Sequence, residues 1–369
     1  MTFDYRKNFS WQYRWVQKII HDPTLFHKDW QDIISASKRM MTASGFAHEE
    51  ANVLQRIRTK ASSINPNYKT SDVAVNLLEA VNVPLNSTVN LLPAAQSINV
   101  SALKFLMHMY FETSSGERSV WVHSLPQEFS NWCSLQFYEK ISAISSATSL
   151  LRSNSEHFTP RERMELANAS GMALAWAQRT IIILANALNQ KSEEHSTSLE
   201  LIRRWFGDSS CTDQDLMQFA LILSTGFKAM IATLTRGKLI FTDFISLREA
   251  STSEEIRFFK SEAFVISNRF EGMDIVYIEQ AFFNPPPGGL LNGPKNWARV
   301  ILHELSHLDA KTIDVPYGSY ARYAWAGIAP HAGFPGKEAI QNADSWAFFA
   351  ADCAQALTEG ERIKALRIT

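Results

Sequence analysis

Residues 303–318 read HELSHLDAKTIDVPYG, and the first five letters form an HExxH motif. Two histidines four positions apart lie one helical turn apart on the same face, so His303 and His307 can direct ring nitrogens at one metal ion. Glu304 follows the first histidine and can reach a water molecule bound to that ion. Imidazole and carboxylate groups are usual zinc ligands. The spacing therefore predicts a zinc site with Glu304 as the general base of a metallopeptidase.

A catalytic zinc site needs a third protein ligand, which must come from outside the motif. The extended metzincin motif requires Gly at position 310 and His or Asp at position 313, but Ala310 and Ile313 stand there, which excludes that class. A glutamate on a later helix would serve in a gluzincin, and Glu338 is the obvious candidate of that kind. Asp314, seven residues after His307, is the stronger candidate.

The sequence before the motif predicts a small sheet followed by a helix. Short β-branched or aromatic runs at 238–244, 263–267 and 274–279 are typical of strands. The last of these strands is expected to be an edge to which an extended peptide adds. Pro294 stands where the first turn of the next helix is expected, and that helix carries KNWARVILHELSHL.

The rest of the chain is predicted to be mainly helical. Apolar residues recur at helical spacing from 9 to 60 and predict two or three amphipathic helices. Residues 62–101 are rich in Asn, Ser and Pro and predict a linker-like stretch with short ordered pieces. HFTPRERMELANA, at 157–169, has the N-cap and proline of a helix start. A boundary near 155 is therefore expected between a helical N-terminal region, 1–155, and a catalytic domain, 156–369.

Composition narrows the classes of partner. The formal net charge is −1, which gives no reason to expect nucleic acid or a membrane surface as a partner. The three cysteines show no CxxC spacing, so reduced thiols are expected. The apolar stretch 172–188 contains Gln178 and Arg179 and is shorter than the roughly 20 residues of a membrane span, which predicts a buried helix of a soluble protein. The N-terminus, MTFDYRKNFSWQYRWVQKII, lacks the pattern of a secretory signal.

The segment HELSHLDAKTIDVPYG resembles the aspzincins, the deuterolysin-like and peptidyl-Lys metalloendopeptidases, whose signature is HExxH followed by GTxDxxYG. Thr312, Asp314, Tyr317 and Gly318 fall in register with that signature. Lys311 stands where the family usually has Gly, and the segment between the second histidine and the aspartate is shorter than expected. The loop is therefore expected to turn differently.

The likeness covers about residues 160–369. It extends to RRWFG at 203–207, DIVYIEQAFF at 274–283 and NADSWAFFA at 342–350. The resemblance implies an α+β fold, mainly helical, in which a zincin-like metallopeptidase domain with a small sheet packed on the HExxH helix follows the helical N-terminal region.

The resemblance also implies roles for individual residues. The implied zinc ligands are His303, His307 and Asp314. Glu304 would be the base, and Tyr317 would donate its hydroxyl to the oxyanion of the tetrahedral intermediate. Asp344 would either line the pocket for the residue after the scissile bond or buttress the zinc helix, and buttressing is favoured.

Together these patterns predict a zinc-dependent metalloendopeptidase that acts on a protein or peptide substrate. The rival hypothesis is a catalytically inactive zinc-binding or interaction protein whose N-terminal half does the work. A further hypothesis is a bacterial effector or toxin, made in the cytoplasm without a signal peptide and exported by a dedicated secretion system. An inhibitor, immunity or secretion partner would then bind the N-terminal region. An intracellular housekeeping protease fits the same facts.

Overall fold

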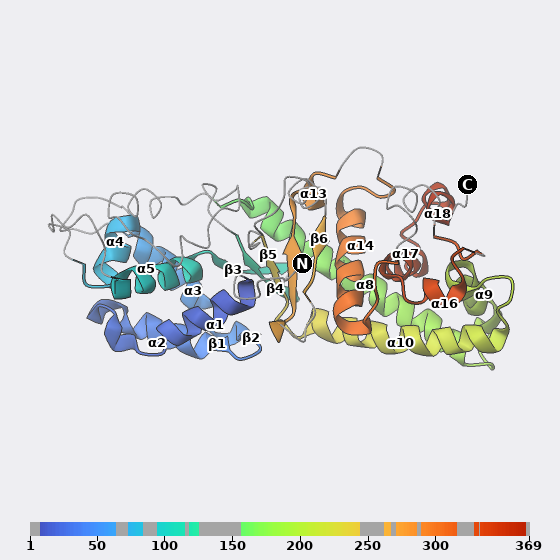
Figure 1. Cartoon of the computed structure of the whole chain (residues 1–369), viewed down its shortest axis with the longest axis horizontal. Coiled ribbons are helices and arrows are strands. Elements are labelled where there is room, and N and C mark those ends of the chain that lie inside the picture. The colour runs from blue at the N-terminus through green and yellow to red at the C-terminus, as the bar shows by residue number, and fades with distance from the viewer. Residues whose placement is uncertain are drawn as a thin grey trace.

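The computed structural model describes residues 8–63, 73–83, 94–114, 118–124, 156–243, 262–266, 271–285, 289–315, 328–331 and 333–366. Helices predominate, and one five-stranded sheet lies between an N-terminal group of helices and a C-terminal group, as Figure 1 shows. The expected fold class, mainly helical α+β, is confirmed.

The N-terminal group consists of short helices. They are α1 (Phe9–Ile19), η2 (Pro23–Leu25), η3 (Lys28–Trp30), α2 (Gln31–Met40), η4 (His48–Glu50), α3 (Asn52–Ser62), α4 (Val73–Ala80) and α5 (Ala94–Met107), with a hairpin of β1 (Met41–Thr42) and β2 (Gly45–Phe46). Asn8 caps α1, because its side chain accepts a hydrogen bond from the Trp11 N–H. The helices expected between 9 and 60 are confirmed, and the predicted linker at 62–101 contains α4 and the beginning of α5.

The C-terminal group surrounds two long helices. Its members are α8 (Pro160–Leu188), α9 (His195–Phe206), α10 (Asp213–Thr235), α13 (Gln280–Phe283), α14 (Gly293–Leu305), η6 (Ser306–Ala310), α16 (Gly336–Ala339), α17 (Ala343–Cys353) and α18 (Glu359–Leu366). The predicted start of α8 is confirmed: Thr159 and Glu162 form a reciprocal capping box around Pro160.

The sheet has the strand order β3-β4-β5-β7-β6. Its strands are β3 (Met109–Ser114), β4 (Arg118–His123), β5 (Ile240–Thr242), β7 (Ile275–Ile278) and β6 (Ala263–Phe264). β4, β5 and β7 run parallel, while β3 and β6 pair antiparallel with their neighbours. The three predicted strands are confirmed, but the expectation that 274–279 forms an edge is wrong. β7 is paired on both sides, by β5 and β6, so β6 is the edge strand beside it within the part of the chain that the structure describes.

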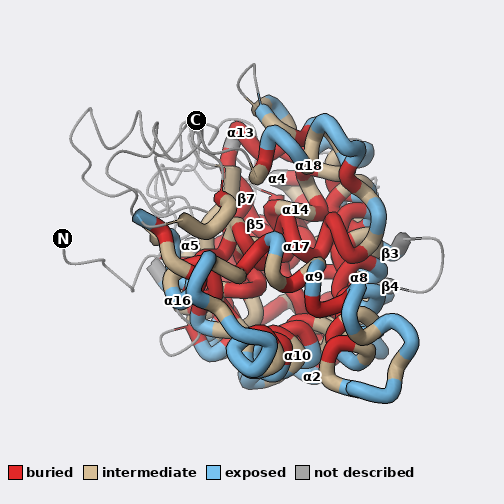
Figure 2. The backbone as a smooth tube through the Cα atoms, turned by 90° about the vertical axis from the view of Figure 1, so that its right-hand side faces the viewer, coloured by how far each residue is buried: buried red, intermediate tan, exposed pale blue. Residues whose placement is uncertain are grey.

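The sheet joins the two sides of the boundary expected near residue 155. β3 and β4 precede that position, and β4 pairs directly with β5. The two hydrophobic cores are shared in the same way. Figure 2 shows buried backbone in red around α14 and α17, in the C-terminal group. Val120 and Val122 of β4 lie in the core of the C-terminal helices, whereas Ile240 and Ile275 lie in the core of the N-terminal helices. The N-terminal region thus supplies part of the sheet beside the catalytic region.

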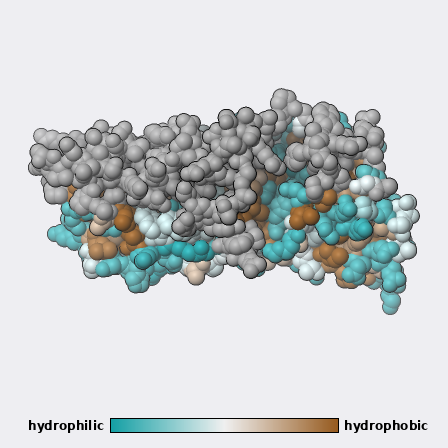
Figure 3. Space-filling model, in the orientation of Figure 1, coloured by the Kyte–Doolittle hydropathy of each residue, from teal (hydrophilic) through white to brown (hydrophobic). Residues whose placement is uncertain are grey.

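Two described helices, α8 and α10, have the length and hydropathy of membrane-crossing helices. In the fold they pack against each other, and α8 also packs against α14. A Cβ at Gly226 of α10 would lie 2.4 Å from the Trp346 ring, so the glycine permits a close approach to α17. Figure 3 shows brown apolar surface set among hydrophilic residues on the half of the molecule that holds α10.

A buried polar cluster ties α1 to the sheet. Asn8 donates a hydrogen bond to the carboxyl of Glu271, and the Tyr277 hydroxyl donates to the same carboxyl at 3.2 Å. That hydroxyl accepts the Phe9 N–H at 3.1 Å, and Arg14 donates to the Glu271 carbonyl. Burial raises the pKa of Glu271 to about 7, because desolvation outweighs these hydrogen bonds and the nearby guanidinium.

The Glu271 carboxyl should make stability depend on pH. The pKa of this carboxyl is about 7 in the folded protein and 4.5 in the unfolded chain. Between these two pH values the folded state keeps a proton that the unfolded chain has released. Stability present below pH 4.5 is therefore lost as the pH rises through 7. Between about pH 5 and pH 8, the wild type should lose roughly 2–3 kcal/mol more free energy of unfolding than Glu271→Gln, which mimics the protonated acid. Urea denaturation of both proteins measures this, and equal pH dependence would contradict it.

Candidate metal centre

The HExxH motif spans the end of α14 and the turn that follows it. Pro294 lies in the first turn of α14, as expected, and Val300, Ile301 and Leu305 are buried in the core. The α-helix ends at Leu305, and the chain continues as one π-helical turn, η6. His303 therefore projects from α14 and His307 from the wider π turn. Single π turns of this kind are frequent at functional sites.

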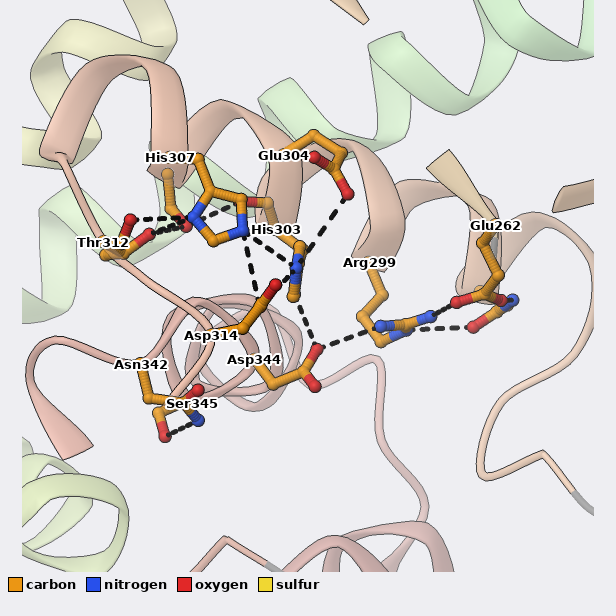
Figure 4. A network of polar contacts seen from close by, with 12 residues as sticks. Glu262, Arg299, His303, Glu304, His307, Thr312, Asp314, Asn342, Asp344 and Ser345 are labelled. Atoms are coloured by element: carbon orange, nitrogen blue, oxygen red, sulfur yellow. Dashed lines mark hydrogen bonds and ion pairs between the residues drawn. The ribbon is translucent and has the colours of Figure 1, made fainter. Parts of the chain in front are cut away.

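Three predicted ligand residues converge, as Figure 4 shows. The Nε2 atoms of His303 and His307 lie 3.1 Å apart. Asp314 Oδ1 is 3.1 Å from the first of these nitrogens and 3.4 Å from the second. Ligands held about 2.0–2.1 Å from zinc at tetrahedral angles stand roughly 3.3 Å from one another. The separations within the triad therefore fit a zinc ion.

The far nitrogens of both rings decide which protonation state each imidazole takes. His303 Nδ1 lies 2.8 Å from Asp344 Oδ1, and His307 Nδ1 lies 2.8 Å from the Thr312 carbonyl oxygen. Both partners are acceptors, so each Nδ1 carries the hydrogen and each neutral ring presents its Nε2 lone pair to the centre. Two Nε2 atoms and the Asp314 carboxylate thus face one point, and this donor set favours a cation there.

Electrostatics at the triad agree with this requirement. Burial lowers the pKa of His303, but Asp344 and Asp314 outweigh burial, and the pKa is raised well above its ordinary value. Burial also lowers the pKa of His307, while its hydrogen bond to Asp314 raises it, with a net increase. Burial raises the pKa of Asp314, but the hydrogen bonds from both histidines lower it overall. A bound metal ion would take the place of the protons that this carboxylate otherwise attracts.

Glu304 has the position of a base and not of a ligand. It is buried, and its Oε1 lies 3.9 Å from His303 Nε2. Burial raises the pKa of its carboxyl, and the two histidines offset part of that increase. Glu338, the alternative third ligand, lies on α16 and is not part of the one ligand cluster found among the described residues. Tyr317 lies outside the described residues.

Asp344 binds the nitrogen of His303 that faces away from the metal position, and it also accepts a hydrogen bond from an arginine. Its Oδ1 accepts a hydrogen bond from Arg299 at 3.0 Å besides the one from His303. Arg299 also donates to the carboxylate of Glu262, so its guanidinium lies between two acids (Figure 4). Neither Arg299 nor Glu262 was predicted from the sequence. The available signal for the arginine was its position one helical turn before His303, on the same face of α14.

Lys311 closes the loop that leads to Asp314 in a left-handed conformation. Its backbone has φ 60° and ψ 31°, directly after the π turn. The Thr312 N–H then donates to the Ser306 carbonyl at 3.2 Å, and the hydroxyls of the same two residues lie 2.6 Å apart. The expected difference in the loop is thus a π turn followed by a left-handed lysine at the position where glycine was expected.

Substitutions at Lys311 should report the cost of this conformation. The left-handed conformation costs a non-glycine residue roughly 1–2 kcal/mol of stability. A glycine variant avoids this strain but loses about 0.5–1 kcal/mol, because its unfolded chain has more conformational entropy. Lys311→Gly is therefore expected to be as stable as the wild type or up to about 1 kcal/mol more stable, whereas the β-branched Lys311→Val is expected to be clearly less stable. Thermal unfolding of the three zinc-loaded proteins measures the order, and a valine variant as stable as the glycine variant would contradict it.

Comparison with known protein families identifies the domain that contains this metal centre. Residues 191–351 match the family Aspzincin_M35, described as lysine-specific metallo-endopeptidase. Residues 191–351 are an aspzincin domain. The chain accordingly contains a zinc metalloendopeptidase domain of this family, and a peptide is the class of substrate that the family implies.

Two further comparisons accompany the aspzincin match. A zinc peptidase from Grifola frondosa is similar at 19% sequence identity, covers 53% of this chain and 97% of its own, and gives a TM-score of 0.35. A search of curated proteins gives no match.

Proposed function

We propose that His303, His307 and Asp314 bind the catalytic zinc and that Glu304 is the general base. The observation that carries this assignment is the convergence of two Nε2 lone pairs and one carboxylate at separations of 3.1–3.4 Å. Asp344 and the Thr312 carbonyl orient the two rings through their Nδ1 atoms. Such outer partners make the imidazoles better ligands.

Zinc, when bound, supplies a Lewis acid and lowers the pKa of a bound water to about 7. Glu304 accepts a proton from the attacking water and returns it to the leaving amine, because its carboxyl lies beside the triad without belonging to it. Tyr317, assigned from its sequence register alone, is proposed to donate its hydroxyl to the developing oxyanion. The peptide is proposed to pair with β6, the edge strand next to β7.

The test combines metal content with cleavage. Mass spectrometry should find one zinc ion per chain in the wild type and none in His303→Ala. A peptide library incubated with and without a chelator should show cleavage that depends on zinc. Zinc without cleavage of any peptide would favour the rival hypothesis of an inactive zinc-binding protein, and absence of zinc would refute the assigned ligands.

We also propose that the peptidase works as an effector or toxin in a target cell, reached through a dedicated secretion route. The support is the joining of a peptidase domain to a helical N-terminal region that shares its sheet. Expression in the cytosol of candidate target cells should reduce growth, and Glu304→Gln should not. Equal growth with both proteins would favour a housekeeping protease.

A further inference from the structure

The side chain of Arg299 lies among carboxylates beside the metal centre. Its guanidinium donates to Asp344 at 3.0 Å and also to Glu262, and its side chain is only 12% exposed. Asn296, one turn earlier on α14, accepts a third hydrogen bond from the Arg299 Nε at 2.9 Å. A planar guanidinium held at three positions by neighbouring acceptors is fixed in place far better than a mobile ammonium.

The two acids that Arg299 joins lie beside the proposed path of the substrate. Glu262 directly precedes Ala263, the first residue of the edge strand β6, and its carbonyl accepts the Glu279 N–H at 2.9 Å. Asp344 lies one imidazole ring away from the metal position, because it binds the Nδ1 of His303. Glu262 and Asp344 thus mark the two ends of the path proposed for the substrate, Glu262 beside the edge strand β6 and Asp344 beside the metal centre.

Among the described residues, every carboxylate at this site is already paired with another group or buried. Asp314 faces both histidines, and Glu304 is buried beside them. Asp344 and Glu262 share the Arg299 guanidinium. A substrate lysine entering here would have to displace a tethered arginine or lose its hydration without gaining a carboxylate, and either change is unfavourable.

We propose that Arg299 is a specificity-determining residue: as an internal cation it takes the position that a substrate lysine would need, so that the subsite bounded by Asp344 and Glu262 prefers neutral side chains. This inference rests on the proposed function and concerns the same site. It sets this chain apart from the lysine specificity that the description of its family states. Removing the guanidinium leaves Asp344 and Glu262 without their shared cation and should admit lysine.

The experiment uses pairs of peptides that differ only in lysine or norleucine, its uncharged analogue, at each position around the cleaved bond. For the zinc-loaded wild type, the ratio of kcat/KM for lysine over norleucine should be one or lower at every position beside this subsite. For Arg299→Met it should rise about tenfold to a hundredfold at one position, as expected for a charge-assisted hydrogen bond. Arg299→Lys restores a cation and should return the ratio to the wild-type value.

Matched controls separate specificity from damage to the fold. Glu262→Gln removes one acid but keeps Arg299 paired with Asp344, so its ratio should stay at the wild-type value. Zinc content and melting temperature are measured for each variant. A wild-type preference for lysine would overturn the proposal without need of any variant, and so would an unchanged ratio in an Arg299→Met protein that holds zinc.

A binding assay distinguishes failure of this inference from failure of the proposed function. In a Glu304→Gln background, calorimetry with the lysine peptide should show tighter binding once Arg299→Met is added, by the same factor of about ten to one hundred. If the wild type cleaves no peptide, the proposed function fails, and this assay decides the role of Arg299 alone. Equal affinities with and without Arg299→Met would overturn that role.

Discussion

Replacing Glu304 by Gln is expected to leave zinc bound and to lower kcat by about a hundredfold to ten-thousandfold. The amide has the shape of the carboxylate but cannot accept a proton from water. Zinc should stay, because the ligand cluster consists of His303, His307 and Asp314, and Glu304 Oε1 stands 3.9 Å from the nearest ligand nitrogen. Steady-state cleavage of one identified peptide, with metal content determined on the same sample, measures both effects.

The pH profile gives the Glu304→Gln result a second readout. Burial raises the pKa of the Glu304 carboxyl in the wild type, so its protonation should produce the acidic limb of the profile of kcat against pH. That limb should be missing from the residual activity of Glu304→Gln. A variant with full activity, or one that has lost its zinc, would contradict the assignment of Glu304 as a base that is not a ligand.

Replacing Asp314 by Ala is expected to raise the zinc dissociation constant by more than the roughly 10–100-fold that loss of an outer partner costs. The reason is that the triad loses its only anionic donor, which lies 3.1 Å and 3.4 Å from the two ligand nitrogens. Activity should fall with zinc occupancy. Competition with a chelator of known affinity measures the dissociation constant, and Asp314→Asn, which keeps an oxygen donor without its charge, should give an intermediate value.

Glu338 provides the matched control for Asp314. It was the alternative third ligand, and it stands on α16 outside the cluster of donor atoms. Glu338→Ala should therefore bind zinc as tightly as the wild type. The reverse order, with zinc lost from Glu338→Ala and kept by Asp314→Ala, would replace the aspartate by the glutamate as third ligand.

The local parts of the candidate site could be predicted because they depend on spacing along one helix. His303 and His307 meet because four residues make about one helical turn, and the shortened loop still brings Asp314 to them. The conformation of that loop could not be predicted in detail. It depends on a π turn and on a left-handed Lys311, which glycine would adopt at no steric cost but which lysine adopts only when contacts around the loop compensate.

Non-local pairing accounts for the features that were predicted wrongly or missed. β7 was taken for an edge, because nothing in its own residues shows that β6 returns antiparallel beside it. β4 and β5 pair across more than a hundred residues of intervening chain, so the expected boundary near 155 gave no sign of a shared sheet. Glu262 reaches Arg299 for the same reason, since 37 residues separate them along the chain.

The sequence by itself determined the metal chemistry of this protein: the types of the ligand residues, their spacing and the glutamate beside them specify zinc and hydrolysis, since these follow from helical geometry and from the donor preferences of the ion. The tertiary structure alone decided which strand is exposed as an edge and which carboxylates are neutralised. Both depend on contacts between segments far apart in the chain, because strand pairing and the burial of an arginine between two acids are settled only when the separate elements pack together.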